Sequence, residues 1–179
     1  MKHTLLIVDD EEYIVRALVR LLRHDPYRVL TASSGEEALD VLAVNDVHVI
    51  LADQRMPGMS GSEFLARARE ICQESVRVVL SGYSDFASIS DAVNRGNIYK
   101  FISKPWNDEL LRAMLVEACE RYDLSRNSTQ LTKIYENSAE AIFIADADGN
   151  IQSVNPAFVR MTGFSPAEVV GQSCSNLFA

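Results

Sequence analysis

Short apolar runs alternate along the chain with stretches in which apolar residues recur at helical spacing. The run TLLIV stops at two acids, and apolar residues then recur from Ile14 to Leu22 with the period of an amphipathic helix. Five strands are expected in this alternation, each followed by a helix: TLLIV, YRVLTA, VHVILAD, VRVVLSG and IYKFIS. Because HVILA and RVVLS each contain an uninterrupted apolar run, their strands are expected to be buried on both faces. The pattern predicts an α/β fold with a five-stranded, doubly wound parallel sheet over residues 1–122.

Two of the predicted helix starts carry a capping box, in which a serine and a glutamate three residues later satisfy each other's backbone N–H groups. The pairs are Ser34 with Glu37 and Ser60 with Glu63. Helices are therefore expected to begin directly after the two serines.

Polar side chains stand where the predicted strands end. Asp9 and Asp10 follow the first strand, Asp53 ends the third, Ser81 ends the fourth, and Lys104 follows the fifth. The carboxyl ends of the strands form one ligand-binding edge in such a sheet, so these groups are expected to converge. Carboxylates about 5 Å apart repel by roughly 3 kcal/mol per pair at an effective dielectric constant of about 20. A cation with oxygen ligands would offset this repulsion, and Mg²⁺ is the usual choice where a phosphate is handled.

The same group of residues predicts phosphoryl transfer. Asp53 is the candidate nucleophile, because a carboxylate can accept a phosphoryl group as an acyl phosphate. Ser81 is a candidate hydrogen-bond partner of the phosphate, and Lys104 is a candidate for neutralising its charge. Taken singly, these features have plainer interpretations: Asp10 would be a helix N-cap, and residues 56–58 would be a tight turn.

Four separated motifs, LLIVDDEE, LADQRMPGMSG, VVLSGYSD and YKFISKPW, resemble the receiver domain of bacterial response regulators over roughly residues 1–122. The resemblance implies a flavodoxin-like fold and a phosphoacceptor module that is not itself an enzyme. It implies that a sensor histidine kinase donates phosphate to Asp53. It also implies that Mg²⁺ is held by Asp9, Asp10, Asp53 and the main-chain carbonyl of Arg55.

The resemblance further implies a switch formed by Ser81 and Phe101, which would reshape the face made by the fourth helix, the fifth strand and the fifth helix. Lys104 would contact the phosphate, and the Lys104–Pro105 peptide bond would be cis. Many relatives carry a smaller or neutral side chain at the position of Arg55. Arg55 and Tyr83, two residues after Ser81, are expected to shield the phosphate and lengthen its lifetime, unless both side chains point into solvent.

The segment after residue 122 has two alternative interpretations. Leu124, Leu131 and Ile134 extend the apolar helical stripe of residues 111–122 after a phase slip. One interpretation is a helical linker over residues 123–134, with two copies pairing through this helix or through the receiver face. The other is a final helix packed on its own sheet and followed by a flexible linker.

From Tyr135 the pattern changes. AIFIAD and IQSVN predict a hairpin turned at ADGN, and two short helices follow, the second with Ser165 as N-cap and Pro166 at its first position. The acids of ADADGN do not fit a calcium loop, because Ile151 stands where glycine is required. Residues 135–179 resemble the first part of a PAS sensor domain. Because a PAS sheet has three more strands, this segment is expected to be truncated or completed by a partner chain.

Composition excludes several classes of function. The net charge of −8 does not provide the basic surface of a nucleic-acid or anionic-membrane binder, so neither partner is expected. The three cysteines lack metal-ligand spacing and are odd in number, and no apolar run is long enough for a signal or membrane segment. A cytoplasmic protein is expected.

Two classes of function compete for these residues. The first is a two-component response regulator that controls an attached PAS or output region, where a cyclic-di-GMP enzyme or a kinase would be the output by family analogy. The second is a phosphatase of the haloacid type, which also uses an Asp nucleophile, Mg²⁺ and a lysine. Against it, Arg55 occupies the place of the second aspartate that would serve as general acid.

Overall fold

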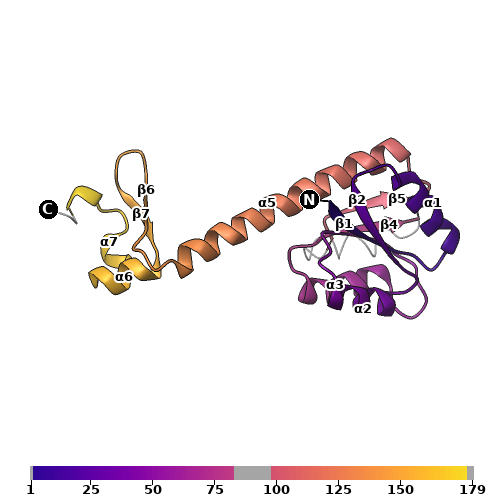
Figure 1. Ribbon diagram of the computed structural model, residues 1–179, viewed down its shortest axis with the longest axis horizontal. Helices are drawn as coiled ribbons and strands as arrows, with labels where there is room; N and C mark the ends of the chain where they lie inside the picture. Colours follow the sequence, from indigo (N-terminus) through magenta and orange to yellow (C-terminus); the bar gives the residue numbers. More distant parts are fainter. Residues whose placement is uncertain (1, 83–97, 177–179) are drawn as a thin grey trace. The chain divides into compact units, whose positions relative to one another are not determined.

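The computed structural model describes residues 2–82 and 98–176 (Figure 1). The chain forms two compact units, Met1–Ser125 and Arg126–Ala179, hereafter unit 1 and unit 2. Each unit has its own sheet and its own apolar core.

Unit 1 contains a five-stranded sheet in which every neighbouring pair of strands is parallel, in the order β2-β1-β3-β4-β5. The strands are β1 His3–Val8, β2 Tyr27–Ala32, β3 Val49–Asp53, β4 Val76–Ser81 and β5 Lys100–Ser103. All five residues of β3 are buried, as expected for a strand covered on both faces. The predicted five-stranded, doubly wound parallel sheet is confirmed.

Helices cover both faces of this sheet (Figure 1). Successive residues of β1 point to opposite cores. Leu6 and Val8 pack in one core with α2, Gly35–Val44, and α3, Gly61–Ile71. Leu5 and Ile7 pack in the other core with α1, Glu12–Leu22, and the first half of α5, Asp108–Asn137. The helix expected between β4 and β5 lies outside the described residues.

The helix starts agree with two of three sequence interpretations. At α3 the Ser60–Glu63 capping box is complete. At α2 the Ser34 hydroxyl accepts the Glu37 N–H as predicted, whereas the Glu37 carboxylate accepts from Ser33 instead of closing the box on Ser34. The interpretation of Asp10 as an N-cap is wrong: Glu11 occupies that position without a side-chain cap, and its N–H donates to Asp9 Oδ1 at 2.9 Å.

Helix α5 is a single helix of 30 residues, so residues 123–134 are helical, as the first alternative predicted, and are not an irregular linker. The predicted stripe Leu111–Tyr122 packs on the sheet of unit 1. Beyond it, Leu124, Leu131 and Ile134 are exposed.

Unit 2 contains the predicted antiparallel hairpin, β6 Phe143–Ala145 and β7 Ile151–Val154. The helices α6, Pro156–Thr162, and α7, Pro166–Val169, follow, and a short 3-10 helix spans Cys174–Asn176. In the hairpin turn the Asp146 carboxylate accepts the backbone N–H groups of Asp148 and Asn150. This carboxylate therefore closes the turn.

The core of unit 2 is small, with Ile151, Phe158 and Val169 at its centre. One buried side chain, that of Asn155, links three segments of the unit around this core. Its carbonyl oxygen accepts the N–H groups of Ile142 and Phe158, and its amide donates to the carbonyls of Tyr135 and Glu140. Unit 2 therefore depends strongly on one amide.

Replacing Asn155 with alanine should destabilise unit 2 selectively, because four backbone groups would lose their partner. We expect its free energy of unfolding to fall by about 2–4 kcal/mol, at roughly 1 kcal/mol net per hydrogen bond. Urea titration followed by amide NMR signals of the two units measures the change. Asn137→Ala is the matched control, because the amide of this exposed residue makes one bond, to the Lys133 carbonyl. The role of Asn155 would be contradicted if the two substitutions lowered the stability of unit 2 equally. It would also be contradicted if Asn155→Ala lowered the stability of both units equally.

Candidate phosphoacceptor site

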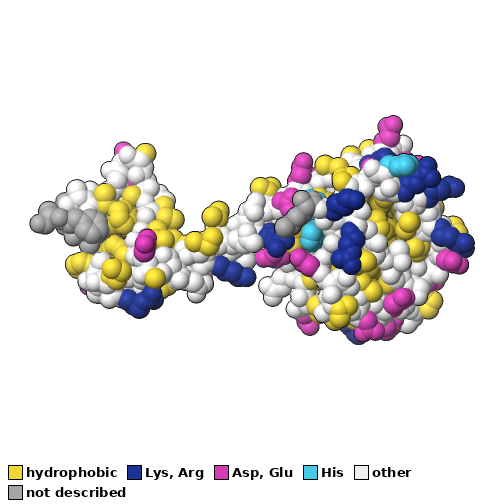
Figure 2. Space-filling model, in the orientation of Figure 1, with side chains coloured by type: hydrophobic (Ala, Val, Ile, Leu, Met, Phe, Trp, Pro, Cys, Tyr) yellow, Lys and Arg dark blue, Asp and Glu magenta, His cyan; other side chains and the backbone are white. Residues whose placement is uncertain are grey.

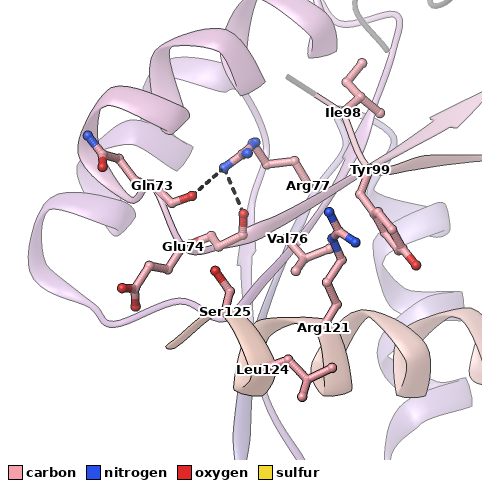
Figure 3. Close-up of a pocket in the computed structure, with 10 residues that line it drawn as sticks. Gln73, Glu74, Val76, Arg77, Ile98, Tyr99, Arg121, Leu124 and Ser125 are labelled. Carbon is pink, nitrogen blue, oxygen red and sulfur yellow. Dashed lines mark hydrogen bonds between the residues drawn. The ribbon is translucent and has the colours of Figure 1, made fainter. Parts of the chain in front are cut away.

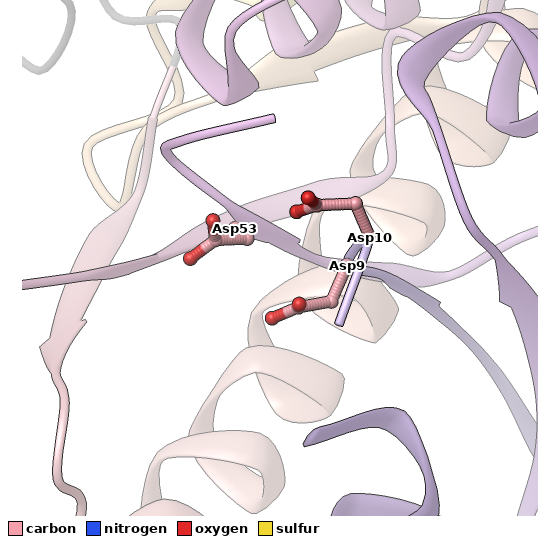
Figure 4. A group of neighbouring side chains, drawn as sticks. All are labelled: Asp9, Asp10 and Asp53. Atoms are coloured by element: carbon pink, nitrogen blue, oxygen red, sulfur yellow. The ribbon is translucent and has the colours of Figure 1, made fainter. Parts of the chain in front are cut away.

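The predicted convergence of polar groups at the carboxyl edge of the sheet is present. Asp9 and Asp10 directly follow β1, and Asp53 is the last residue of β3. Ligand oxygens from these three carboxylates lie within 4.8 Å of one another, and Figure 4 shows the three side chains facing a common space. Asp9 and Asp53 are buried, whereas Asp10 is exposed and lies at the solvent side of the cluster.

Lys104 lies between the two buried carboxylates. Its Nζ is 2.6 Å from Asp53 Oδ1 and 2.8 Å from Asp9 Oδ2. Burial alone would lower the pKa of the Lys104 ammonium, but its hydrogen bonds and charge interactions with Asp53 and Asp9 raise it above the ordinary value. The site lysine is therefore held in its charged form.

The charge at this edge is not balanced by Lys104. The pKa of Asp9 is raised because burial outweighs the hydrogen bonds donated by Lys104 and by the Glu11 N–H. One ammonium faces three carboxylates, and the negative charge of Asp53 also acts on Asp9. Asp9, Asp10 and Asp53 offer carboxylate oxygens, which suit a hard divalent cation.

The Asp53 carboxylate is held from two sides. Lys104 binds Oδ1, and the backbone N–H of Arg55 donates to Oδ2 at 2.9 Å. The Arg55 side chain is exposed. These two contacts fix the orientation of the carboxylate, which offers one oxygen within 4.8 Å of a ligand oxygen of Asp9 and of Asp10.

The remaining predicted site residues lie on β4 and β5, with one exception. Ser81 is buried at the end of β4 and its carbonyl accepts the Lys104 N–H at 2.7 Å, so the two residues are adjacent at the same edge. The Lys104–Pro105 peptide bond is cis, as the resemblance implied. Phe101 is partly exposed on β5. Tyr83 lies outside the described residues.

The acidic cluster lies beside the smaller of two cavities among the described residues of unit 1. A cavity of about 180 Å³ opens beside Asp9 and Asp10. A larger one, of about 700 Å³, lies at the opposite edge of the sheet, where β4 begins at Val76 and Tyr99 precedes β5 (Figure 3). Its Arg77 guanidinium donates to backbone carbonyls in the turn that follows α3, including that of Ser75. The acidic cluster, and not the larger cavity, contains the groups suited to phosphoryl transfer.

Sequence reasoning missed a glycine that the site requires. A Cβ atom on Gly61, the first residue of α3, would lie 2.1 Å from the Asp53 carbonyl oxygen. Glycine therefore allows the start of α3 to lie directly against the backbone of Asp53. The sequence signal was the glycine that closes the motif DQRMPGMSG.

Family comparisons agree with this geometry. Residues 5–116 match the family described as response regulator receiver domain, and residues 129–179 match the PAS fold. The chain belongs to the response regulator receiver family. The predicted order of a receiver followed by a PAS segment is confirmed, and the relatives support a two-component response regulator.

This receiver chain is similar to the hydrogenase transcriptional regulatory protein HoxA of Cupriavidus necator, with 44% identity over 177 residues, covering 93% of this chain and 35% of the relative. The protein of the same name from Bradyrhizobium diazoefficiens is 41% identical over 125 residues, covering 70% of this chain and 26% of the relative. The chain thus spans about a third or less of the length of these relatives.

Solved structures show the same fold. A structure described as adenylate cyclase from Rhodopirellula baltica superposes with a TM-score of 0.72 at 35% identity, covering 74% of this chain and 98% of that one. The signal receiver domain of an HD domain-containing protein from Pseudomonas fluorescens gives a TM-score of 0.67 at 33% identity, covering 70% and 93%. Among the described residues of the receiver chain, no helix combines the length and apolar character needed to span a bilayer.

Changing Gly61 to alanine should destabilise unit 1 of the receiver chain, because the added Cβ meets backbone atoms that cannot rotate away. We expect a loss of about 1–3 kcal/mol in the free energy of unfolding, measured by urea titration. Gly35→Ala is the matched control: its Cβ would meet the flexible Met59 side chain at 3.0 Å, so the loss should be smaller. A Gly61→Ala variant as stable as the parent would show that the close approach is not a constraint.

Proposed function

We propose that residues 1–122 are a phosphorylation-controlled switch whose acceptor is Asp53 and whose donor is a sensor histidine kinase. The observation that carries the proposal is the buried Asp53 carboxylate, ion-paired with Lys104 and within 4.8 Å of two further carboxylates. The contacts from Lys104 and the Arg55 N–H orient Asp53 as a nucleophile.

In the proposed reaction an Asp53 oxygen forms a bond to phosphorus while the bond from phosphorus to the donor nitrogen breaks. The donor histidine keeps the electron pair of the broken bond, and Asp53 becomes an acyl phosphate. Lys104 then pairs with a phosphate oxygen, and the Ser81 hydroxyl donates to another. Lys104 can make this exchange because it already contacts the accepting carboxylate.

We propose Mg²⁺ as the cation of this site. Asp9, Asp10 and Asp53 would hold it, together with the main-chain carbonyl of Arg55. The ion would neutralise the negative charge that accumulates when a phosphoryl group approaches three carboxylates. The excess of carboxylates over ammonium groups, with the raised pKa of Asp9, supports a cation at this place.

The proposed readout begins at Ser81 and Phe101. A shift of the Ser81 hydroxyl toward the phosphate would change the packing of Phe101 and the face around β5, and so bias an equilibrium between two states. Through residues 123–134 the change would reach the PAS segment, residues 135–179. The output would be a partner or activity governed by that segment, and pairing of two copies through the receiver face or α5 would be one form of it.

The HoxA relatives are named transcriptional regulatory proteins, and we propose a regulatory output of this kind. The phosphatase alternative has no support from the matched family. The exposed Arg55 side chain also offers no carboxyl group as general acid two residues after Asp53. We place the protein in the cytoplasm, where its kinase donor would act.

Asp53→Asn should abolish labelling by acetyl phosphate and Mg²⁺, because it removes the nucleophile. Chelation of the metal should likewise abolish labelling of the parent chain. Intact-protein mass spectrometry measures the phosphoprotein, and circular dichroism verifies folding. Asp40→Asn, on the exposed face of α2, is the control and should label like the parent. Full labelling of Asp53→Asn would assign the acceptor to another residue.

Arg55→Asn should speed the loss of phosphate severalfold, because the exposed side chain two residues after the acceptor would no longer obstruct water or pair with the phosphate. The rate is followed in purified phosphoprotein with excess Mg²⁺, for Arg55→Asn, Tyr83→Ala and the double variant. Arg67→Asn makes the same change on an exposed position of α3 and should leave the rate unchanged. A double variant no faster than the parent would refute shielding.

A further inference from the structure

The residue after the phosphoacceptor caps helix α3. The first N–H groups of an α-helix have no partner within the helix. At α3 the Gly61 N–H donates to the Gln54 carbonyl at 3.0 Å, and the Ser62 N–H donates to Gln54 Oε1 at 3.2 Å. The third N–H, that of Glu63, donates to the Ser60 hydroxyl at 3.3 Å. Two of these three donors are therefore satisfied by Gln54.

Gln54 is buried, and its contacts run to elements on both sides of it. Its own N–H donates to the Leu80 carbonyl on β4 at 2.9 Å, and its Nε2 donates to the Ser62 hydroxyl at 3.0 Å. The orientation of the amide is determined, because the Ser62 N–H can only donate and must face the oxygen. A buried amide with both ends bound resists displacement, since loss of a partner leaves a polar group unpaired.

This arrangement lies directly beside the nucleophile. Gln54 is the residue between Asp53 and Arg55, and the Arg55 N–H holds Asp53 Oδ2. Gly61, whose N–H binds the Gln54 carbonyl, also lies against the Asp53 carbonyl without space for a Cβ. The backbone that directly follows Asp53 is thus fixed to β4 and to α3 through Gln54.

We propose that Gln54 is a positioning residue for phosphoryl transfer, acting with Ser62. Its side chain joins the start of α3 to the peptide that carries the Arg55 N–H, and so holds the Asp53 carboxylate in its reactive orientation. The proposal rests on the proposed function of Asp53. If Gln54 were only an N-cap that stabilises α3, its replacement would lower stability without changing the orientation of Asp53.

The test compares four single variants in the full chain. Gln54→Leu removes both side-chain contacts and keeps a side chain of similar size. Ser62→Ala removes the hydroxyl partner of Gln54. Ser62→Thr keeps a hydroxyl and should therefore behave like the parent chain. Ser60→Ala is the matched control, because it removes the other side-chain cap of α3 without touching Gln54. Urea titration gives the loss of stability for each variant.

The direct readout is the amide hydrogen-exchange rate of Arg55, measured by NMR, since this N–H binds the Asp53 carboxylate. Gln54→Leu should raise that rate about tenfold, as expected when one hydrogen bond to a charged group is lost. The second readout is acetyl phosphate labelling at varied Mg²⁺. Gln54→Leu should lower the rate at saturating Mg²⁺ by about tenfold to a hundredfold, the range expected for a misplaced nucleophile. Ser60→Ala should leave both readouts near those of the parent.

Unchanged Arg55 exchange in Gln54→Leu, or an equal rise in Ser60→Ala, would overturn the positioning role whatever the labelling shows. A parent chain that takes up no phosphate would instead overturn the proposed function. In that case faster Arg55 exchange in Gln54→Leu would still establish that Gln54 orients the carboxylate.

Discussion

Two buried carboxylates share one ammonium group at the carboxyl edge of the sheet, and this charge arrangement constrains the rest of unit 1. Lys104 reaches Asp9 and Asp53 because β1, β3 and β5 end at the same edge. Taking these charges out of water is costly unless the geometry is well determined. The parallel sheet, the cores on its two faces and the capping of α3 all serve to hold the strand ends in place. The remaining negative charge of the carboxylates makes the edge suitable for a divalent cation.

Much of this arrangement could be predicted because it follows from local patterns in the sequence. Apolar runs that end in Asp9, Asp53 and Ser81 identify both the strands and the edge at which the chemistry lies. The Ser60–Glu63 capping box is also a local pattern, because its two partners lie three residues apart, and it identifies the start of α3. The hairpin of unit 2 follows from its turn residues, of which Gly149 has a φ of +83°.

Other features depend on tertiary contacts and have no local pattern. The local sequence favours Asp10 as the cap of α1, but the preceding carboxylate, Asp9, accepts the Glu11 N–H. Gln54 carried no signal, because its partner Ser62 is brought to it by the turn of the chain between β3 and α3. Asn155 likewise binds backbone groups 13 to 20 residues earlier in the chain. Buried amides of this kind become visible only when the segments that they join are in place.

The side chains of β1 alternate between the two faces of the sheet, so neighbouring residues of this strand pack in different cores. Leu6 belongs to the core under α2 and α3, and Ile7 belongs to the core under α1 and α5. These two residues, adjacent in sequence, therefore pack in different core clusters. Unit 1 in this sense has two hydrophobic compartments divided by a common backbone layer. A disturbance in one compartment reaches the other by displacing the sheet itself, and the sheet's carboxyl edge carries the aspartates.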